Sequence, residues 1–464
     1  MSLGFYGGAG TVTGSRFLLR TGGQSTLVDA GLFQGLKEHR LLNWKRPDFD
    51  PRRLNQILIT HAHIDHSGYL PRLVRDGFKG PASCTPATNE LLELLLMDAA
   101  HLQEEDAAYA NRKGFSKHKP ALPLYTTRDA TAALERIRPV RYGKRLKLGR
   151  GLSAQYHNAG HILGAACVEF EVDRKSKPVT VVFSGDVGRY DVPLHVDPDP
   201  MPDCDVLVIE STYGDRDHDR RTVEDQIEEP FRRTFERGGV VLIPAFAVGR
   251  SQLVTLVLRR MMVEGRLPEV PIHIDSPMAV DATRIYSHHL YDRILDDDLT
   301  EDGRARLFPQ NVHYHSTTAE SKELNTVTGP RVIISASGML TGGRVVHHLG
   351  WRLPDPKNLI ALVGFQAAGT RGRKLQEGVA SLRMHGREVP VRAEFMVVHG
   401  LSAHADRSEL LKWYDSAGRK PRQVFVVHGE EASARALAQA LHKQYGVEVH
   451  TPALGDVVDL SEIL

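Results

Sequence analysis

The feature that most constrains this 464-residue chain is the string HAHIDH, which runs from His61 to His66. It directly follows Gln56 to Thr60, a run whose apolar residues predict a β-strand. Neutral imidazoles and carboxylates are ligands that zinc prefers. The spacing directs His61 and His63 one way and Asp65 and His66 toward a neighbouring point, so one segment could serve two metal ions. A solvent-facing histidine cluster is the alternative interpretation.

Two more candidate ligands come from later in the chain, because HxHxDH cannot complete even one four-ligand site. His161 lies in AGHILGAA, beside glycines and before the apolar run Ala165 to Val172. Asp186 follows VTVVFSG, which is a predicted strand. Taken alone, the histidine could be a loop residue and the aspartate a turn former. Together with HAHIDH they have the residue types and the order of a binuclear hydrolase.

These motifs resemble the pattern of the metallo-β-lactamase superfamily, which is HxHxDH, then His, then a bridging Asp. The resemblance implies one zinc ion held by His61, His63, His161 and Asp186, and a second held by Asp65, His66 and Asp186. It also matches Asp29, in LVDAG, to the first acidic motif, where a carboxylate accepts a hydrogen bond from a ligand imidazole. A turn carboxylate before Gly31 is the equally open interpretation of Asp29.

Three later motifs resemble the β-CASP branch of that superfamily, which works on nucleic acids. They are IESTYGDR at Ile209 to Arg216, SAHAD at Ser402 to Asp406 and VVHGE at Val426 to Glu430. By this resemblance Glu210 is the acidic motif, His404 the middle histidine and His428 the last, which would complete the second zinc site. A histidine in the last position favours RNA over DNA. His399 lies in a similar string, but only His428 follows the predicted strand Gln423 to Val427.

Further strings resemble prokaryotic relatives of the endonuclease subunit of the cleavage and polyadenylation specificity factor. They are SASGMLTGGR at Ser335 to Arg344, GFQAAGTRGR at Gly364 to Arg373 and PAFAVGRSQ at Pro244 to Gln252. The resemblance implies a zinc-dependent ribonuclease that cuts single-stranded RNA, as an endonuclease, a 5′-to-3′ exonuclease or both, leaving 5′-phosphate and 3′-hydroxyl ends. The implied catalytic residues are His404 as general acid, Glu210 as its hydrogen-bond partner, and Asp65. His404 could instead cap the helix that follows it.

The segment from Arg221 to Gln366 alternates predicted helices and strands. Thr222 begins a helix that Gly238 and Gly239 end, and strand-length apolar runs follow, which predicts a parallel sheet with helices on both faces. The expected fold is therefore a metallo-β-lactamase αββα sandwich with an inserted, mainly parallel α/β β-CASP domain and the active site in the cleft between them. The expected boundaries are 1–212 for the first part, 213–390 for the insertion and 391–464 for the return segment. Met97 to Tyr125 is predicted to be a helix and then a loop, without an assigned function.

The formal net charge of +2 means that a polyanion would have to be bound locally. The segment Arg136 to Arg150 contains seven basic residues and no acidic one, although it could be a solvated strand face. Glycine-rich turns at helix starts are better candidates, because they present backbone N–H groups to phosphates. The predicted RNA phosphate-binding residues are Ser335, Ser337, Gly338, Arg344, Arg371, Arg373 and Arg250.

The expected cofactors are two zinc ions per chain, with manganese as an alternative, and no small-molecule cofactor. The expected partner is single-stranded RNA. The sequence does not decide whether the protein forms a homodimer. No apolar run is long enough to predict a membrane span. Three scattered cysteines, Cys84, Cys167 and Cys204, predict reduced thiols in a cytoplasmic protein.

Two other functions compete with the ribonuclease. A small-molecule metallohydrolase of the lactamase or thioesterase type explains HAHIDH, His161 and Asp186, but it gives Glu210, His404 and the insertion no role. An inactive RNA-binding subunit is disfavoured because every ligand position is intact. The sequence leaves the endonuclease and exonuclease modes open.

Overall fold

The computed structural model describes residues 1–174, 177–219, 221–296, 299, 311–364, 366 and 369–461. The chain forms two compact units. The first consists of Met1–Tyr190, Asp197–Asp217 and His404–Leu464, and the second of Asp191–Val196 and His218–Ala403. The chain therefore leaves the first unit and returns to it. These units change at 217/218 and 403/404, whereas the sequence analysis placed the domain boundaries at 212/213 and 390/391.

The first unit contains two seven-stranded sheets. In spatial order, the strands of the first sheet are β22 (Val457–Asp459), β1 (Ser2–Phe5), β2 (Phe17–Thr21), β3 (Gln24–Val28), β4 (Gln56–Leu58), β5 (Ala82–Cys84) and β6 (Ile137–Pro139). Those of the second are β21 (Glu448–His450), β20 (Gln423–Val426), β11 (Val206–Ile209), β10 (Val179–Phe183), β9 (Ala166–Val172), β8 (Leu152–Asn158) and β7 (Leu146–Gly149).

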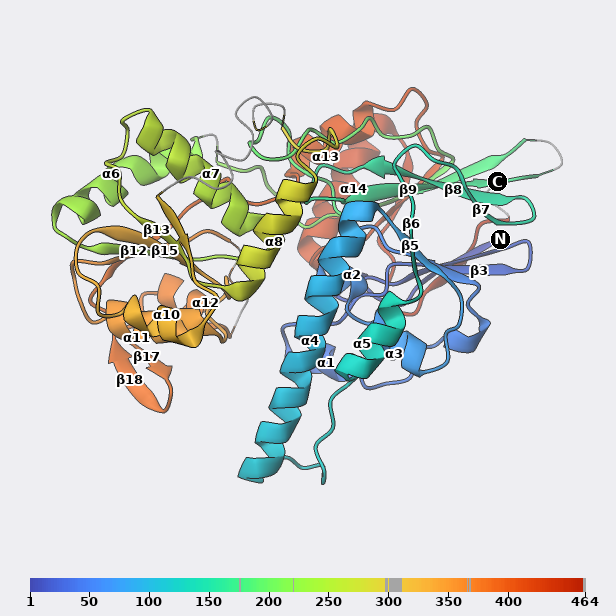
Figure 1. Cartoon of the computed structure of the whole chain (residues 1–464). Coiled ribbons are helices and arrows are strands. Elements are labelled where there is room, and N and C mark those ends of the chain that lie inside the picture. The colour runs from blue at the N-terminus through green and yellow to red at the C-terminus, as the bar shows by residue number, and fades with distance from the viewer. Residues whose placement is uncertain are drawn as a thin grey trace. The chain divides into compact units, whose positions relative to one another are not determined.

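The two sheets pack face to face, with helices on their outer sides (Figure 1). The helices α13 (Arg407–Asp415) and α14 (Glu431–Tyr445) cover the second sheet. Beside the first sheet lie α1 (Lys37–Leu42), α2 (Ile64–Ser67), α3 (Leu70–Arg75), α4 (Pro86–Lys113) and α5 (Thr127–Leu134), and the short 3-10 helix η1 (Pro51–Arg53) precedes β4 in the chain. The predicted αββα sandwich is confirmed.

The strand period explains this layering, because successive side chains point to opposite faces of a sheet. In β10, Val181 and Phe183 belong to the core between the two sheets, together with Phe17 from the first sheet. Val182, between them, instead packs in the core that contains Trp413 of α13. Near-continuous apolar strands such as VTVVF therefore lie in the middle of the sandwich, buried on both faces.

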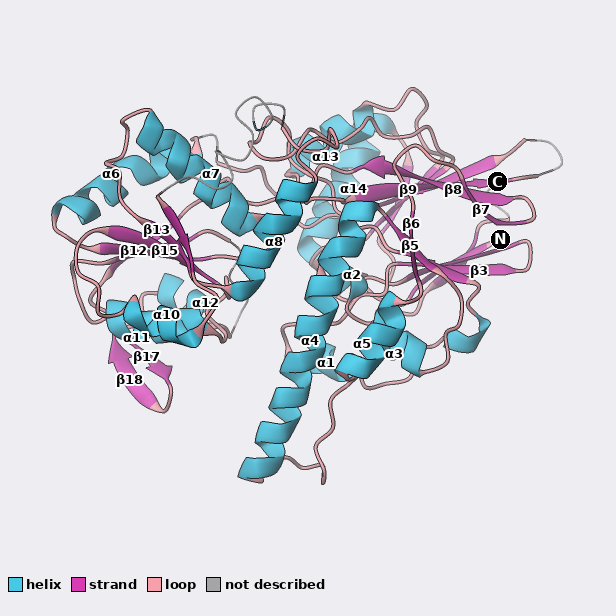
Figure 2. Ribbon diagram, in the orientation of Figure 1, coloured by secondary structure: helices cyan, strands magenta, loops and turns pink. Residues whose placement is uncertain are grey.

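Among its described residues, the second unit contains a six-stranded sheet in which all neighbouring strands are parallel (Figure 2). In spatial order its strands are β14 (Val312–Tyr314), β13 (Ile272–Ile274), β15 (Arg331–Ser335), β12 (Val240–Pro244), β16 (Leu359–Leu362) and β19 (Glu394–Val397). The helices described in this unit are α6 (Val223–Glu236), α7 (Arg250–Val263), α8 (Pro277–His288), α10 (Thr318–Glu323), α11 (Arg344–Arg352) and α12 (Arg371–Gln376). An antiparallel hairpin joins β17 (Ser381–Met384) to β18 (Arg387–Pro390).

Helices cover both faces of this parallel sheet, as its alternating pattern predicted. Val241 and Ile243 of β12 pack with Leu258 of α7 on one face. Leu242 packs with Leu349 of α11 on the other. The predicted start of α6 is also confirmed, since the Thr222 side chain accepts a hydrogen bond from the backbone N–H of Asp225.

A strand that follows residue 390 pairs with the sheet of the second unit. Strand β19 pairs with β16 through register partners that run from Leu359 with Glu394 to Leu362 with Val397. The segment after residue 390 therefore still contributes a strand to the sheet of the second unit. The expected domain boundaries stay predictions.

The segment Met97 to Tyr125 is helical as far as Lys113, where α4 ends at Gly114. Gly114 has a positive φ of 67°, the left-handed conformation in which glycine commonly terminates a helix. Among the described residues, none of the helices combines the length and the apolar character needed to cross a bilayer.

Candidate metal centre

The candidate ligands follow the carboxyl ends of strands in the first unit. HAHIDH comes after β4, which is parallel to β3, and Asp29 directly follows β3. Asp186, Glu210 and His428 follow β10, β11 and β20, which are parallel neighbours. Because the carboxyl ends of parallel neighbours share one edge of a sheet, residues hundreds of positions apart in the sequence come together here.

One group consists of His61, His63, His161 and Asp186, whose ligand atoms all lie within 4.8 Å of one another. The Nδ1 atom of His63 lies 3.1 Å from Nε2 of His61 and 3.2 Å from Nε2 of His161. The Asp186 Oδ2 atom lies 3.4 Å from Nε2 of His61 and 3.6 Å from Nε2 of His161. A tetrahedral zinc ion with ligands at about 2.05 Å sets them roughly 3.3 Å apart, so this spacing suits zinc.

A second group consists of Asp65, His66 and His428. The Nε2 atoms of His66 and His428 are 3.0 Å apart, and Asp65 Oδ2 lies 3.5 Å from Nε2 of His428. Asp186 faces this group as well, since its Oδ1 atom lies 3.2 Å from Nε2 of His66. The two carboxylate oxygens of Asp186 therefore face different groups of imidazoles.

The Asp186 carboxylate is buried, and neither of its oxygens accepts a hydrogen bond from any described residue. A buried charge without hydrogen bonds is costly unless a counter-charge or a metal compensates it. Imidazole nitrogens converge on both oxygens at the spacing of metal ligands, so this orphaned carboxylate fits a bridge between two cations.

Asp29 is buried and holds the histidines in place. Its Oδ2 atom lies 2.7 Å from Nδ1 of His66, and its Oδ1 atom accepts a hydrogen bond of 2.8 Å from the backbone N–H of Thr60. The Thr60 hydroxyl donates to Asp29 Oδ2 over 2.9 Å and lies 3.0 Å from Nδ1 of His61. With Nδ1 of both rings engaged, Nε2 of both is directed at the candidate metal positions. Thr60, directly before HAHIDH, was missed by the sequence analysis.

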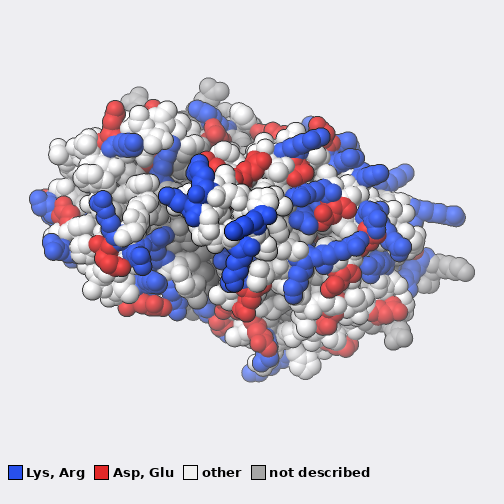
Figure 3. Space-filling view, turned by 90° about the horizontal axis from the view of Figure 1, so that it is seen from below, with Lys and Arg blue, Asp and Glu red and all other residues white. Residues whose placement is uncertain are grey.

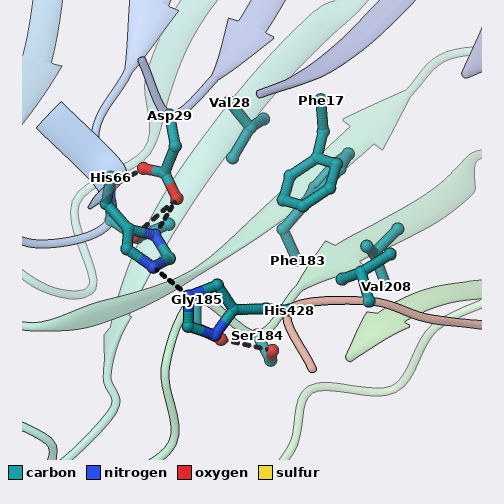
Figure 4. Close-up of a pocket in the computed structure, with 11 residues that line it drawn as sticks. Phe17, Val28, Asp29, His66, Phe183, Ser184, Gly185, Val208 and His428 are labelled. Atoms are coloured by element: carbon teal, nitrogen blue, oxygen red, sulfur yellow. Dashed lines mark hydrogen bonds and ion pairs between the residues drawn. The ribbon is translucent and has the colours of Figure 1, made fainter. Parts of the chain in front are cut away.

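Figure 4 shows Asp29, His66 and His428 in succession beside a small cavity, with Val28, Phe17 and Phe183 on its apolar side. These apolar side chains belong to the core between the sheets. The ligand groups therefore border an apolar core of low dielectric constant, where electrostatic interactions are stronger than in water.

The string VVHG occurs twice, at Val397 to Gly400 and at Val426 to Gly429, and the structure gives its two histidines different environments. His428 is buried in the first unit and takes a left-handed backbone conformation with φ of 46°, which is uncommon for a residue other than glycine. Its Nδ1 atom lies 3.2 Å from the Thr212 hydroxyl, a second contact that the sequence analysis missed. His399 is exposed and belongs to the second unit, and it is in none of the candidate ligand groups of the described residues.

His404 and Glu210 lie beside Asp186. The Nδ1 atom of His404 is 3.3 Å from Glu210 Oε1 and 3.8 Å from Asp186 Oδ2. Buried Glu210 is itself held by the backbone N–H groups of Val187 and Thr212, over 2.7 and 3.2 Å. The helix-capping alternative for His404 is wrong, because the side chain of Asp406 caps α13 and forms a capping box with Glu409.

The protonation states of most ligands suit metal binding, and His66 is the exception. Burial lowers its pKa, but Asp186 and Asp29 outweigh burial and raise the pKa well above the ordinary value, so a metal ion there would displace a proton. Burial lowers the pKa of His61 to about 3 and that of His63 to about 4, so both imidazoles are neutral and can offer a lone pair at neutral pH. Burial opposes the charge on Asp186, but neighbouring imidazoles, led by His428, hold the pKa of its carboxyl well below the ordinary value. Burial also lowers the pKa of His404, but Glu210 and Asp186 outweigh it and raise the value to about 8.

The predicted phosphate-binding residues belong to the second unit. Arg250, Arg344 and Arg371 are the first residues of α7, α11 and α12, which follow the neighbouring strands β12, β15 and β16. The structure therefore gathers three helix starts at one edge of the sheet. In GFQAAGTRGR, residues 365, 367 and 368 lie outside the described residues.

Most of these side chains are engaged in holding loops. Arg344 donates to Asp275 Oδ1 over 2.7 Å and to the carbonyl of Ser316 over 2.7 Å. Arg371 donates to the carbonyls of Leu340 and Arg383, and Arg250 to that of Val363. The buried Ser335 hydroxyl donates to the carbonyl of Asp275. Arg373 pairs with Glu377 at the surface, the Ser337 hydroxyl lies 3.0 Å from that of Thr341, and Gly338 is buried. Phosphate binding by these residues stays a prediction.

The basic segment Arg136 to Arg150 forms β6, a turn and β7, and most of its charged side chains are exposed. Arg145 pairs with Glu171. Figure 3 shows Lys and Arg side chains spread over one face of the molecule with Asp and Glu between them. Exposed charges fit a solvated strand face, and polyanion binding by this segment stays a prediction.

Comparison with known proteins gives three matching family models. The Metallo-beta-lactamase superfamily model matches residues 9–229, the Beta-Casp domain model residues 251–375, and the Zn-dependent metallo-hydrolase RNA specificity domain model residues 388–452.

Several curated relatives match over almost the whole chain. Ribonuclease TTHA0252 of Thermus thermophilus is 38% identical over 459 residues, covering 98% of both chains. Transcription termination factor FttA of Methanocaldococcus jannaschii is 30% identical over 468 residues, covering 98% of this chain and 71% of that protein. A crystal structure of a protein of unknown function from Enterococcus faecalis matches with a TM-score of 0.55 at 14% identity, covering 98% of this chain and 99% of that one, which supports the fold alone.

Proposed function

Since the chain belongs to the β-CASP branch of the metallo-β-lactamase superfamily, we propose that it is a zinc-dependent ribonuclease that hydrolyses phosphodiester bonds of single-stranded RNA. The observation that carries the proposal is the buried Asp186 carboxylate, whose two oxygens face two separate groups of imidazoles. The match to an RNA specificity domain and the name of the Thermus thermophilus relative support RNA as the substrate.

We assign two zinc ions per chain to these groups. His61, His63, His161 and Asp186 would hold one ion, and Asp65, His66, His428 and Asp186 the other. When bound, the ions supply Lewis-acid activation of a water molecule and neutralise the charge that develops on the phosphate. The spacing of the ring nitrogens and the predominance of imidazole favour zinc over manganese.

His404 is assigned as the general acid that protonates the departing sugar oxygen. A proton donor is needed because that oxygen leaves as an alkoxide unless it is protonated in the transition state. The raised pKa keeps the imidazole protonated near neutral pH, and Glu210 fixes the ring by accepting from Nδ1. Its Nε2–H is then the proton that can be transferred. This step leaves a 3′-hydroxyl on one product and a 5′-phosphate on the other.

Asp29→Asn is expected to weaken metal binding about 10- to 100-fold, which is the usual effect of losing a carboxylate that orients a metal-ligating histidine. The amide cannot supply the same charge to His66 Nδ1, although the side chain keeps its shape. Zinc affinity measured by competition with a chelator checks this result. Asp173→Asn, which changes an exposed carboxylate directly after β9, is the control. Unchanged zinc affinity in Asp29→Asn would contradict the orienting role.

A time course on single-stranded RNA labelled at its 3′ end tests the proposed function. The substrates carry a 5′-monophosphate or a 5′-hydroxyl, and the metal-loaded protein is compared with Asp186→Ala. Discrete fragments indifferent to the 5′ group support an endonuclease. Rapid loss to the shortest products, with the 5′-monophosphate preferred, supports a 5′ exonuclease. If neither RNA is cut while a β-lactam or thioester is hydrolysed, the small-molecule alternative replaces this proposal. The cytoplasmic location stays a prediction.

A further inference from the structure

The segment 98–123, called the arm below, has no part in the proposed reaction. It comprises the second half of α4 and the loop that returns to α5, and it extends past α3 and α5 (Figure 1). The loop is tied to the helix, because Asn111 donates to the carbonyl of Ala121 over 3.0 Å and accepts from its N–H over 2.7 Å. The arm therefore presents a defined surface.

The arm exposes large apolar side chains along the line by which α4 packs on the first unit. Leu91 and Leu95 are buried at the base of the helix, and the same helical face continues through Leu102 and Tyr109. Leu102 is 51% exposed, Tyr109 48%, Phe115 65% and Leu122 59%. The Tyr109 and Phe115 rings lie 5.9 Å apart. Clustered exposed apolar side chains of this kind mark interaction surfaces.

The charges of the arm are separated along its length. From 98 to 106 it carries Asp98, Glu104, Glu105 and Asp106 and no Lys or Arg. From 107 to 119 it carries Arg112, Lys113, Lys117 and Lys119 and no Asp or Glu. The charges are placed evenly about Tyr109, with Glu105 and Lys113 four residues to either side and Asp106 and Arg112 three.

We propose that the arm is a dimer interface whose partner is the arm of a second copy of this chain, packed antiparallel about a two-fold axis near Tyr109. A two-fold interface must be self-complementary. In this arrangement Glu105 and Asp106 of one copy face Lys113 and Arg112 of the other, while the apolar stripes cover each other. A parallel arrangement would place like charges together.

The observations favour a protein partner over RNA. The basic tip alone would suit a phosphate backbone, but the adjacent acidic stretch repels one, and the apolar stripe lies on both stretches. From Asp98 to Lys113 the helix is about 22 Å long, enough for a helix-pair contact. The proposal does not depend on the reaction that the metal centre performs.

Sedimentation velocity of the full-length protein over a range of concentrations tests the interface. The wild type is expected to form a dimer, and Leu102→Glu combined with Tyr109→Glu should raise the dissociation constant about 100-fold or more, because the substitutions place charge at the apolar centre of both halves of the contact. Val263→Glu changes an exposed valine in the second unit and should leave the mass unchanged. Zinc content and RNA cleavage verify that each variant is folded.

A charge-reversal pair keeps the proposal testable if the double variant fails to fold. Glu105→Lys and Lys113→Glu should each weaken the dimer about tenfold, since each pair occurs twice by symmetry, and their combination should restore it. The two residues are about 12 Å apart on one helix, too far to pair within one copy. Restoration therefore reports contact between copies.

Crosslinking supplies an independent measurement. Tyr109→Cys places a thiol at the proposed axis, and the three native cysteines are buried. A short bifunctional maleimide should then link two copies, whereas Val263→Cys should not be linked. A wild type that stays monomeric up to about 100 μM overturns the proposal. A dimer that persists in the Leu102→Glu, Tyr109→Glu variant also overturns it. So does a variant that loses affinity for RNA while its sedimenting mass stays the same as that of the wild type.

Discussion

Replacing Asp186 by alanine is expected to remove bound metal and to lower RNA hydrolysis at least about 1,000-fold. The substitution deletes both oxygens that face the two groups of imidazoles. The remaining imidazoles would bring two cations close together without the carboxylate charge between them. Metal catalysis contributes several kcal/mol, and about 4 kcal/mol corresponds to a factor of roughly 1,000.

Metal analysis of the dialysed Asp186→Ala protein, together with its rate on labelled RNA, measures this effect. Asp173→Ala is the matched control, because it removes an exposed carboxylate after β9 and should keep both metal and activity. A variant that retains two zinc ions per chain would contradict the bridge, whatever its activity. A variant that loses its metal but still cuts RNA would instead contradict the proposed mechanism.

His404→Ala is expected to lower turnover about 10²- to 10⁴-fold while both metal ions stay bound. General acid catalysis contributes about this factor, and His404, which is grouped with Asp186 and Glu210, is not among the ligands assigned to either ion. Single-turnover cleavage and zinc content should be measured on the same preparation. His399→Ala, an exposed histidine in the similar string, should retain full activity.

The pH dependence separates an acid from a structural histidine. A general acid acts only when it is protonated, so turnover falls as the pH rises through its pKa. The Glu210 and Asp186 carboxylates raise the pKa of His404 to about 8. Metal bound to Asp186 would offset part of that charge, so the alkaline limb is expected between 6.5, the ordinary value, and about 8. The limb should disappear in His404→Ala; an unchanged limb would assign it to another group.

Much of the fold could be predicted from local patterns. The Thr222 cap of α6 and the apolar runs that form β12 and β15 depend on residues that are adjacent in the sequence. These elements can therefore be predicted without knowledge of long-range contacts. The pairing of β19 with β16 was not predicted, because it depends on a contact between two strands that are separated in the sequence. The engagement of Arg344 by Asp275 was missed for a similar reason, since the two residues belong to different strand–loop connections.

The sequence by itself determined the chemistry of the candidate centre, because HAHIDH concentrates imidazoles and a carboxylate in one short segment that needs no long-range contact to offer them to a metal. Only the tertiary structure decided how the distant groups are used. It placed His428 beside His66, made Asp29 an orienting carboxylate, and directed the two oxygens of Asp186 to different imidazoles. These roles depend on distances of a few ångströms between segments far apart in the chain, and the order of strands in the two sheets sets those distances.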